Sequence, residues 1–365
     1  MMATSDPQEL DVPFGIAELL KDEAKMIARR VFLLDNSGST SMGDGKYLAQ
    51  GGRAGYQMVP CTRWEEICNM AIDHAKWNAM LGVPAEFHIL NPMGGMGWME
   101  GIGYAVVDTS SGKSDAEKQV EALRRFLQRN QPNGATPLSK RLGDIRQRIQ
   151  RERATLTQEG QRVVVVIATD GMPTTPYSGT SEPSDRSAFV AALRELANID
   201  AYIVLRLCTD EQPVVDFYGD IDAEVELNFE VLDDIESEAQ ELKKLGNGFI
   251  TYTPLLHKIR EGGCFLKVLD IVDERPLTRG DIYLLLQYLL KRSAYDDILP
   301  PDPEEFCTEV ERRLVEDYKG EWGFDPLKKA MAPPVDTRLL RKAMGCQTGL
   351  ESTLDGFADE RSVES

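Results

Sequence analysis

The sequence lacks the features that mark membrane and secreted proteins. No apolar run approaches the roughly 18 residues needed to span a bilayer. The N-terminal residues have neither the basic start nor the apolar stretch of a signal peptide, and neither end carries a lipidation motif. We therefore expect no membrane insertion and a cytoplasmic location, with the nucleus as the alternative.

Cysteine and histidine are too scattered for a disulfide framework or a zinc site. The 6 cysteines include no Cys-x-x-Cys pair, so we expect reduced thiols. The three histidines, His74, His88 and His257, are isolated from one another, whereas a zinc site needs clustered ligands. We expect each histidine to be an ordinary core or surface residue.

Basic residues are outnumbered, with 41 Lys and Arg against 60 Asp and Glu and a net charge of -19. This balance argues against a nucleic-acid partner, because phosphates require a basic face. The stretch 210–241 holds 13 acidic residues and no Lys or Arg. Such a run is commonly a solvated face. Because it follows the end of a predicted strand, it can also strengthen a pole that attracts cations.

Short apolar runs alternate with amphipathic stretches between about residues 29 and 260. We expect strands at 30–35, 86–90, 103–107, 163–168, 201–207 and 229–232. We expect helices at 62–81, with Thr62 as its cap, and at 114–129, 137–155, 187–197 and 253–261. The run 163–168 is β-branched and continuously apolar, which is typical of a parallel strand covered on both faces. The alternation predicts a doubly wound α/β domain.

The pattern changes towards the C-terminus. Helices are expected at 277–292 and 304–319, separated by a Pro-rich linker, and the polar, acidic residues after Cys346 are expected to be disordered. The predicted organisation is an N-terminal segment at 1–28, an α/β domain at 29–262, a mainly helical extension at 263–346 and an acidic tail at 347–365.

Three short motifs carry most of the functional information. Asp35-Asn-Ser37-Gly-Ser39 directly follows the first expected strand, and Asp170-Gly follows the strand at 163–168. Gly-Ala-Thr136-Pro lies between two expected helices. In an open α/β sheet the ligand site lies outside the carboxyl ends of the strands, where Asp35 and Asp170 both fall.

These five side chains have the chemistry of a site for a hard cation. Mg²⁺ takes about six oxygen ligands at roughly 2.1 Å and usually keeps some water. Asp-x-Ser-x-Ser directs one carboxylate and two hydroxyls to one point, and Thr136 and Asp170 add a further hydroxyl and carboxylate. The structural alternative is that Ser and Asp here serve only as turn and cap residues.

The motifs resemble the metal-ion-dependent adhesion site of von Willebrand factor type A (vWA) domains. Asp35, Ser37, Ser39, Thr136 and Asp170 match its five positions without substitution, and the resemblance covers about residues 29–262. It implies a mostly parallel, Rossmann-like sheet with one antiparallel edge strand. It also implies that the serines, and the threonine in the ligand-bound state, coordinate the metal directly. The carboxylates then act largely through water, and an acidic residue of a partner completes the site.

The chain departs from the simplest vWA pattern at 41–61, which separates the first motif from the helix that follows it. This insertion is interpreted either as a lid or specificity loop over the metal or as a disordered surface excursion. Among vWA proteins, the chain most resembles intracellular eukaryotic members of undefined role.

The predicted function is a divalent-cation-dependent protein-binding module. Mg²⁺ is the expected ion, with Mn²⁺ as the alternative, and the partner is expected to present an Asp or Glu. One alternative is a metal-dependent hydrolase, for which Asp44 is the best but a poor candidate base, so we expect no enzyme. The other is a vWA scaffold whose assembly role does not need the metal. The extension is expected to cap the domain or to respond to occupancy of the metal site.

Overall fold

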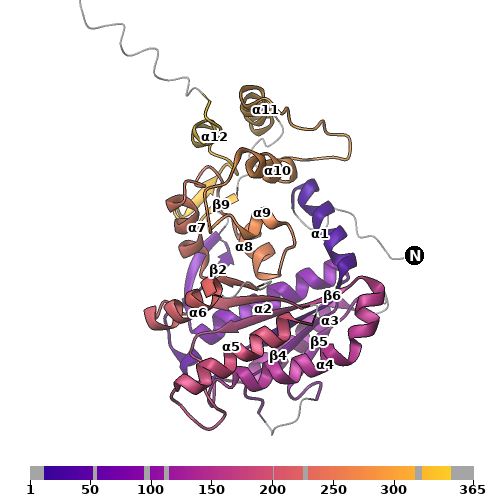
Figure 1. Cartoon of the computed structure of the whole chain (residues 1–365), viewed down its shortest axis with the longest axis vertical. Coiled ribbons are helices and arrows are strands. Elements are labelled where there is room, and N and C mark those ends of the chain that lie inside the picture. Colours follow the sequence, from indigo (N-terminus) through magenta and orange to yellow (C-terminus); the bar gives the residue numbers. More distant parts are fainter. Residues whose placement is uncertain are drawn as a thin grey trace, which may run out of the picture.

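The computed structural model describes residues 12–51, 56–93, 99–110, 115–199, 201–224, 229–316 and 323–346. A layered α/β unit forms the lower part of the molecule in the view of Figure 1, and a mainly helical unit forms the upper part. The acidic tail predicted at 347–365 lies outside the described residues. The domain boundaries proposed from the sequence stay predictions.

A six-stranded sheet forms the centre of the α/β unit. Its strands are β1 (Ile27–Leu34), β4 (Ala85–Ile89), β5 (Tyr104–Val107), β6 (Arg162–Thr169), β7 (Ala201–Leu207) and β8 (Phe229–Leu232). They lie in the order β5-β4-β1-β6-β7-β8, and every neighbouring pair is parallel except β4 with β5. The doubly wound, mostly parallel sheet with one antiparallel edge strand is therefore confirmed.

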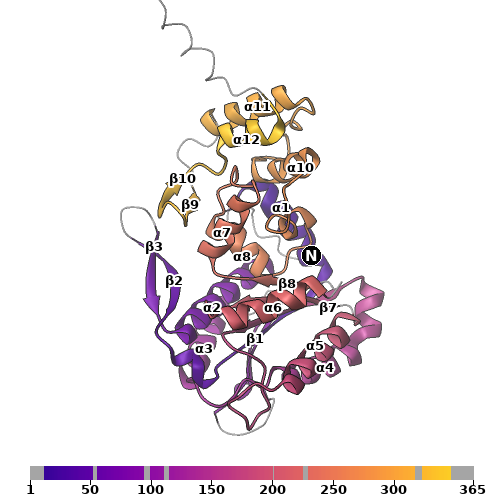
Figure 2. The same ribbon diagram turned by 60° about the vertical axis from the view of Figure 1, so that its left-hand side comes forward.

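Helices cover both faces of the sheet, and Figure 2 shows the sheet between them. One face packs against α2 (Arg63–Leu81) and α3 (Ala116–Arg129); the other packs against α4 (Leu138–Glu159), α5 (Pro183–Ala197) and α6 (Gln212–Glu224). Alternate strand residues enter the two cores: Phe32 of β1 packs with α2, and its neighbour Leu33 packs on the opposite side. Burial on both faces explains why β6 is apolar without alternation.

Local signals determine where α2 begins and ends. Thr62 caps its first turn in a capping box with Glu65, as the sequence predicts for Thr62. Gly82 ends the helix with a φ of 67°, a left-handed conformation that glycine adopts without a steric penalty. The Arg63 N–H donates to the Met42 carbonyl at 3.0 Å, which holds the start of α2 beside the first motif.

The insertion at 41–61 forms a short antiparallel hairpin. A single 3-10 turn, η2 (Gly38–Ser41), leads from the first motif towards β2 (Gly45–Gln50), which pairs with β3 (Tyr56–Cys61). The interpretation as a disordered excursion is therefore wrong for the described part of the insertion. These two strands were not predicted from the sequence.

The helical unit has its own apolar core, and Trp77 and Leu81 of α2 pack against that core. Its elements are α7 (Ile235–Lys244), α8 (Pro254–Glu261), α9 (Lys267–Asp270), α10 (Arg279–Leu289), α11 (Pro303–Glu316), α12 (Thr337–Met344) and the hairpin β9 (Gly323–Asp325) with β10 (Ala330–Ala332). The N-terminal helix α1 (Phe14–Met26) contributes Ile16 and Leu20 to the same core. Helices α10 and α11 confirm the expected pair, whereas α1, α6, α7, α9 and α12 were not predicted.

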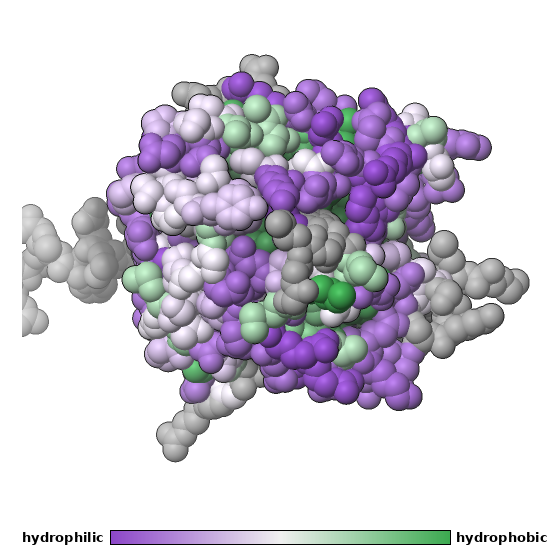
Figure 3. Space-filling view, turned by 90° about the horizontal axis from the view of Figure 1, so that it is seen from below, coloured by the Kyte–Doolittle hydropathy of each residue, from purple (hydrophilic) through white to green (hydrophobic). Residues whose placement is uncertain are grey.

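The face of the molecule that is seen from below is mainly hydrophilic (Figure 3). The view from below Figure 1 shows apolar residues only in small groups among polar ones (Figure 3). Within the described residues, no helix is both long and apolar enough to cross a bilayer.

Candidate metal centre

The two predicted carboxylates lie at the carboxyl ends of adjacent parallel strands. Asp35 follows β1, and Asp170 follows β6. The backbone N–H of Asp35 donates to the carbonyl oxygen of Ala168 at 2.9 Å, which continues the β1–β6 register past the end of β1. Sheet pairing therefore brings both acids to the same edge.

The hydroxyls of the first motif connect these two acids. The Ser37 Oγ lies 3.0 Å from the Ser39 Oγ, and the Ser39 hydroxyl donates to Asp170 Oδ1 at 2.9 Å. Asp35 Oδ1 accepts the backbone N–H of Ser37 at 2.8 Å. These contacts connect Asp35 to Asp170 through the backbone N–H and hydroxyl of Ser37 and the hydroxyl of Ser39.

Thr136 reaches the same place from the loop between α3 and α4. Its backbone exchanges two hydrogen bonds with Thr174, at 2.9 and 3.0 Å. An ideal Cβ built on Gly171 would lie 3.8 Å from the Thr136 Oγ1 and 3.9 Å from the Ser39 Oγ. Both hydroxyls therefore flank the backbone that follows Asp170, and the structure brings all five predicted residues together.

Gly134 is required for this approach. Its φ is 73°, and a Cβ there would lie 2.9 Å from the Asn91 Oδ1. The carbonyl oxygen of Gly134 accepts the Gly38 N–H at 3.1 Å, which ties the threonine loop to the serine turn. A side chain at position 134 would push these two loops apart.

Most of the side chains in the centre are buried. Asp35 is fully buried, and Ser37, Thr136 and Asp170 are 2%, 6% and 1% exposed, while Ser39 opens to solvent. Burial raises the pKa of Asp35, and the neighbouring Asp170 charge adds to this effect. Burial also raises the pKa of Asp170, although Arg63 opposes it. Two buried carboxylates and three hydroxyls, with the centre open to solvent at Ser39, fit a hard divalent cation. The charge of the ion would offset the repulsion between the two carboxylates.

Arg63, the first residue of α2, also belongs to this centre and was missed in the sequence. Its guanidinium is 1% exposed and donates from Nη1 to Asp170 Oδ2 at 3.0 Å. Nε and Nη2 bind both oxygens of Asp44 at 2.8 and 2.7 Å, and Nη2 also donates to Glu211 at 3.0 Å. These acidic partners raise the pKa of Arg63.

The sequence does contain a signal for Arg63. A basic residue in the first turn of a helix is opposed by the positive end of the helix dipole. Residues that break a local preference are found at functional sites. The arginine directly after the Thr62 cap is such a residue, but its partners lie 19, 107 and 148 positions away in the sequence.

Thr169 and three asparagines form hydrogen bonds that support the centre, and these residues were not identified from the sequence. The Thr169 hydroxyl donates to Asp35 Oδ2 at 2.6 Å. The fully buried Asn36 donates from its amide to the Asn91 carbonyl and accepts the Asn91 N–H, at 2.9 and 2.8 Å. The Asn133 N–H donates to the Asn36 carbonyl at 2.7 Å. These bonds hold the motif loop against its two neighbouring loops.

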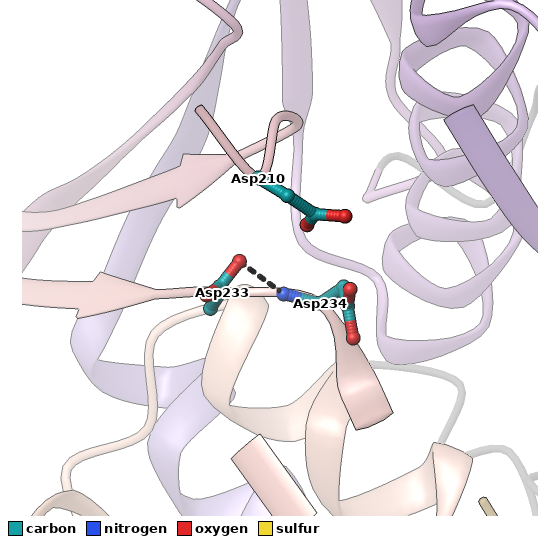
Figure 4. A group of neighbouring side chains, drawn as sticks. All are labelled: Asp210, Asp233 and Asp234. Atoms are coloured by element: carbon teal, nitrogen blue, oxygen red, sulfur yellow. Dashed lines mark hydrogen bonds between the residues drawn. The ribbon is translucent and has the colours of Figure 1, made fainter. Parts of the chain in front are cut away.

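A second acidic group lies beyond Glu211, at the ends of β7 and β8. It consists of Asp210, Asp233 and Asp234 (Figure 4). Asp234 caps α7 by accepting the N–H groups of Glu236 and Ser237 at 2.7 and 2.9 Å, and Asp233 accepts the N–H of Asp234 at 2.8 Å. Helix capping explains the position of Asp234, so we assign no metal to this group.

The histidines and cysteines do not form a separate metal site among the described residues. His74 and His257 contact Glu261 at 3.2 Å, and His88 contacts Glu86 at 2.8 Å. All six cysteines are free thiols. The histidines thus act as buried partners of acidic side chains.

No protein-family model matches the chain, and no curated protein matches it in sequence. Among solved structures, it is similar to the manganese-loaded TRAP protein of Plasmodium vivax, with 12% identity over 57% of this chain and 69% of that chain and a TM-score of 0.34. It is also similar to a mutant of the PilB minor pilin from Streptococcus sanguinis, with 12% identity over 57% of each chain and a TM-score of 0.36. These similarities are too remote to support an argument about function.

Proposed function

We propose that the chain is a distant relative of vWA domains and acts as a divalent-cation-dependent protein-binding module. The ion, Mg²⁺ with Mn²⁺ as the alternative, would be held by Ser37, Ser39 and Thr136, with Asp35 and Asp170 acting largely through water. An Asp or Glu of the partner protein takes the remaining position.

One observation carries this proposal. The Ser39 hydroxyl lies within 3.0 Å of both the Ser37 hydroxyl and a carboxylate oxygen of Asp170, which is 131 residues away in the sequence. Turn and cap roles for Ser37 and Ser39 do not require a contact with the end of another strand. Convergence of oxygen ligands at a buried, acidic point is what a hard cation needs.

The exposure pattern also supports binding of a partner. Asp35, Ser37 and Asp170 lie inside, and Ser39 is exposed, so the open side of the centre faces solvent. The bound ion would supply a positive charge for a carboxylate. A charge-assisted contact of this kind, partly shielded from water, can anchor an interface whose other contacts are modest.

Replacing Ser39 by Ala tests the proposal against a matched control in the same turn. Ser41 is exposed and donates to the Gly38 carbonyl at 2.7 Å, so Ser41→Ala removes a hydroxyl from η2 at a position outside the five residues. Titration calorimetry with MgCl₂ and MnCl₂ should give wild-type affinity for Ser41→Ala and at least about tenfold weaker binding for Ser39→Ala, equivalent to about 1.4 kcal/mol. Equal affinities for both variants would contradict the proposed site.

Partner capture completes the test. An affinity column carrying the wild-type chain should retain a protein in MgCl₂ and release it in EDTA, and the Ser39→Ala column should fail to retain it. If the Ser39→Ala column retains the protein in EDTA as strongly as the wild-type column does in MgCl₂, the result would instead support a scaffold that does not need the metal.

We propose a binding role rather than catalysis. Asp44, the candidate base, has both carboxylate oxygens bound to Arg63, whose hydrogen bonds lower the pKa of Asp44. A base with a lowered pKa accepts protons poorly near neutral pH. Metal-dependent turnover of a phosphate or ester substrate would contradict this assignment.

The proposal includes a cytoplasmic setting of the kind found for intracellular eukaryotic vWA proteins. The six free thiols are compatible with a reducing compartment. Fractionation of cells that express the tagged chain checks this point, and recovery of the chain in the medium would contradict it.

A further inference from the structure

Arg63 places a fixed positive charge beside the proposed ion. Its Nη1 lies 3.0 Å from Asp170 Oδ2, while the Ser39 hydroxyl binds the other oxygen, Oδ1. The guanidinium is 1% exposed and Asp170 is 1% exposed, so water screens this pair weakly. One face of Asp170 is thus neutralised before any ion arrives.

Arg63 also joins the centre to two flanking segments. It binds Asp44, which precedes the β2–β3 hairpin, and Glu211, which follows β7. The side chains of Asp44 and Glu211 are 54% and 52% exposed. Their charges are screened by solvent, so they offset the field of Arg63 at the centre less than their number suggests.

The buried charges determine what the occupied centre attracts. Asp35 and Asp170 carry two negative charges, and Arg63 carries one positive charge. With a divalent ion bound, these three side chains and the ion have a net charge of about +1. Without Arg63, the two carboxylates would neutralise the ion. A buried excess charge is costly unless an opposite charge binds, so the occupied centre favours an anion.

On the basis of the proposed function, we propose that Arg63 is the specificity-determining residue of the metal centre. It weakens binding of the ion alone and makes the ion-bound centre selective for an anionic ligand, a carboxylate of the partner. Metal and partner then bind cooperatively, because the carboxylate of the partner offsets the excess positive charge that the bound ion creates.

The test uses the full chain with Mn²⁺ and acetate as probes. Free Mn²⁺ is measured by electron paramagnetic resonance in sodium acetate and in sodium chloride of equal ionic strength. We expect Arg63→Gln to bind Mn²⁺ alone about tenfold tighter than wild type, equivalent to about 1.4 kcal/mol. Acetate should tighten Mn²⁺ binding by the wild-type chain and have little effect on Arg63→Gln.

Two further variants control for folding and for the exposed acids. Arg63→Lys keeps the positive charge and should retain the acetate effect. If Arg63→Lys loses the effect as well, a loss of local structure rather than of charge explains the result. Asp44→Asn should change Mn²⁺ affinity less than Arg63→Gln, because Asp44 is half exposed.

The outcomes separate this inference from the proposed function. If the wild-type chain fails to bind Mn²⁺, the proposed function itself is wrong. If the wild-type chain binds Mn²⁺ but Arg63→Gln shows the same affinity and the same acetate effect, only the role of Arg63 is overturned.

Discussion

Replacing Asp35 by Asn should raise the free energy of unfolding in the absence of metal and lower it, relative to wild type, in the presence of metal. The Asp35 carboxylate is fully buried and accepts hydrogen bonds from the Ser37 N–H and the Thr169 hydroxyl at 2.8 and 2.6 Å. Burial and the nearby Asp170 charge raise its pKa above the ordinary range. Without a cation, the ionised form is therefore penalised in the folded protein.

The direction with pH follows from this raised pKa. A carboxyl whose pKa is higher in the folded than in the unfolded state carries no penalty at low pH, where it is protonated in both states. The penalty grows as the pH rises above the ordinary Asp value of about 3.9. The benefit of removing the charge of Asp35 is therefore largest on the alkaline side.

The size of the stability change caused by Asp35→Asn depends on the burial of the charge, on its hydrogen bonds and on metal binding. Asparagine keeps the shape, an acceptor for Ser37 and a group that can donate to Thr169. A buried, uncompensated ion costs several kcal/mol, and each hydrogen bond to the charge returns about 1.5–3 kcal/mol. We expect the metal-free variant to be about 1–2 kcal/mol more stable than wild type at pH 8. At 100 times its Kd, Mg²⁺ stabilises the wild type by about 2.7 kcal/mol, and the variant should gain little.

Urea unfolding followed by circular dichroism, in EDTA and in MgCl₂, measures both effects. Glu23→Gln is the matched control, because Glu23 is also a buried acid with a pKa raised by burial and lies on α1, outside the metal centre. It should keep the wild-type response to Mg²⁺. The reasoning is refuted if Asp35→Asn gains as much stability from Mg²⁺ as the wild type does.

Two other substitutions test the supports of the site and of the fold. Arg260→Met removes a buried guanidinium that binds Glu230 at 2.8 Å and Glu238 at 2.6 Å, and should cost about 3–5 kcal/mol at pH 8 in urea unfolding. Burial raises the pKa of Glu230 to about 8 against the opposing effect of Arg260, so the stability of the fold falls as the pH rises towards 8. The destabilisation caused by Arg260→Met should therefore be smaller at pH 5, where Glu230 is protonated in the folded chain. A destabilisation that does not change with pH would argue against this account. Gly134→Ala should cost about 1–3 kcal/mol and weaken Mn²⁺ binding, because a Cβ there meets Asn91 and the φ is 73°; calorimetry showing wild-type Mn²⁺ affinity would contradict the positioning role of Gly134.

Much of the α/β unit could be predicted because its signals are local. The continuous apolar run at 163–168 is a central strand, and Thr62 caps α2 as expected. The antiparallel edge strand β5 agrees with what the vWA resemblance implies. By contrast, the hairpin β2–β3 comes from a segment with no clear period-2 alternation, and its strands are stabilised by pairing with each other.

The sequence by itself determined the strands of the sheet, most of the helices that cover it and the three motifs that hold the five oxygen-bearing residues, since burial periodicity and motif spacing are properties of neighbouring residues. The tertiary structure decided that Arg63 joins Asp170, Asp44 and Glu211, and that Asn36 holds Asn91 and Asn133. It also decided that α1 packs into the core of the helical unit. These contacts join residues far apart in the sequence, and their energies depend on burial and charge that exist only once the chain has folded.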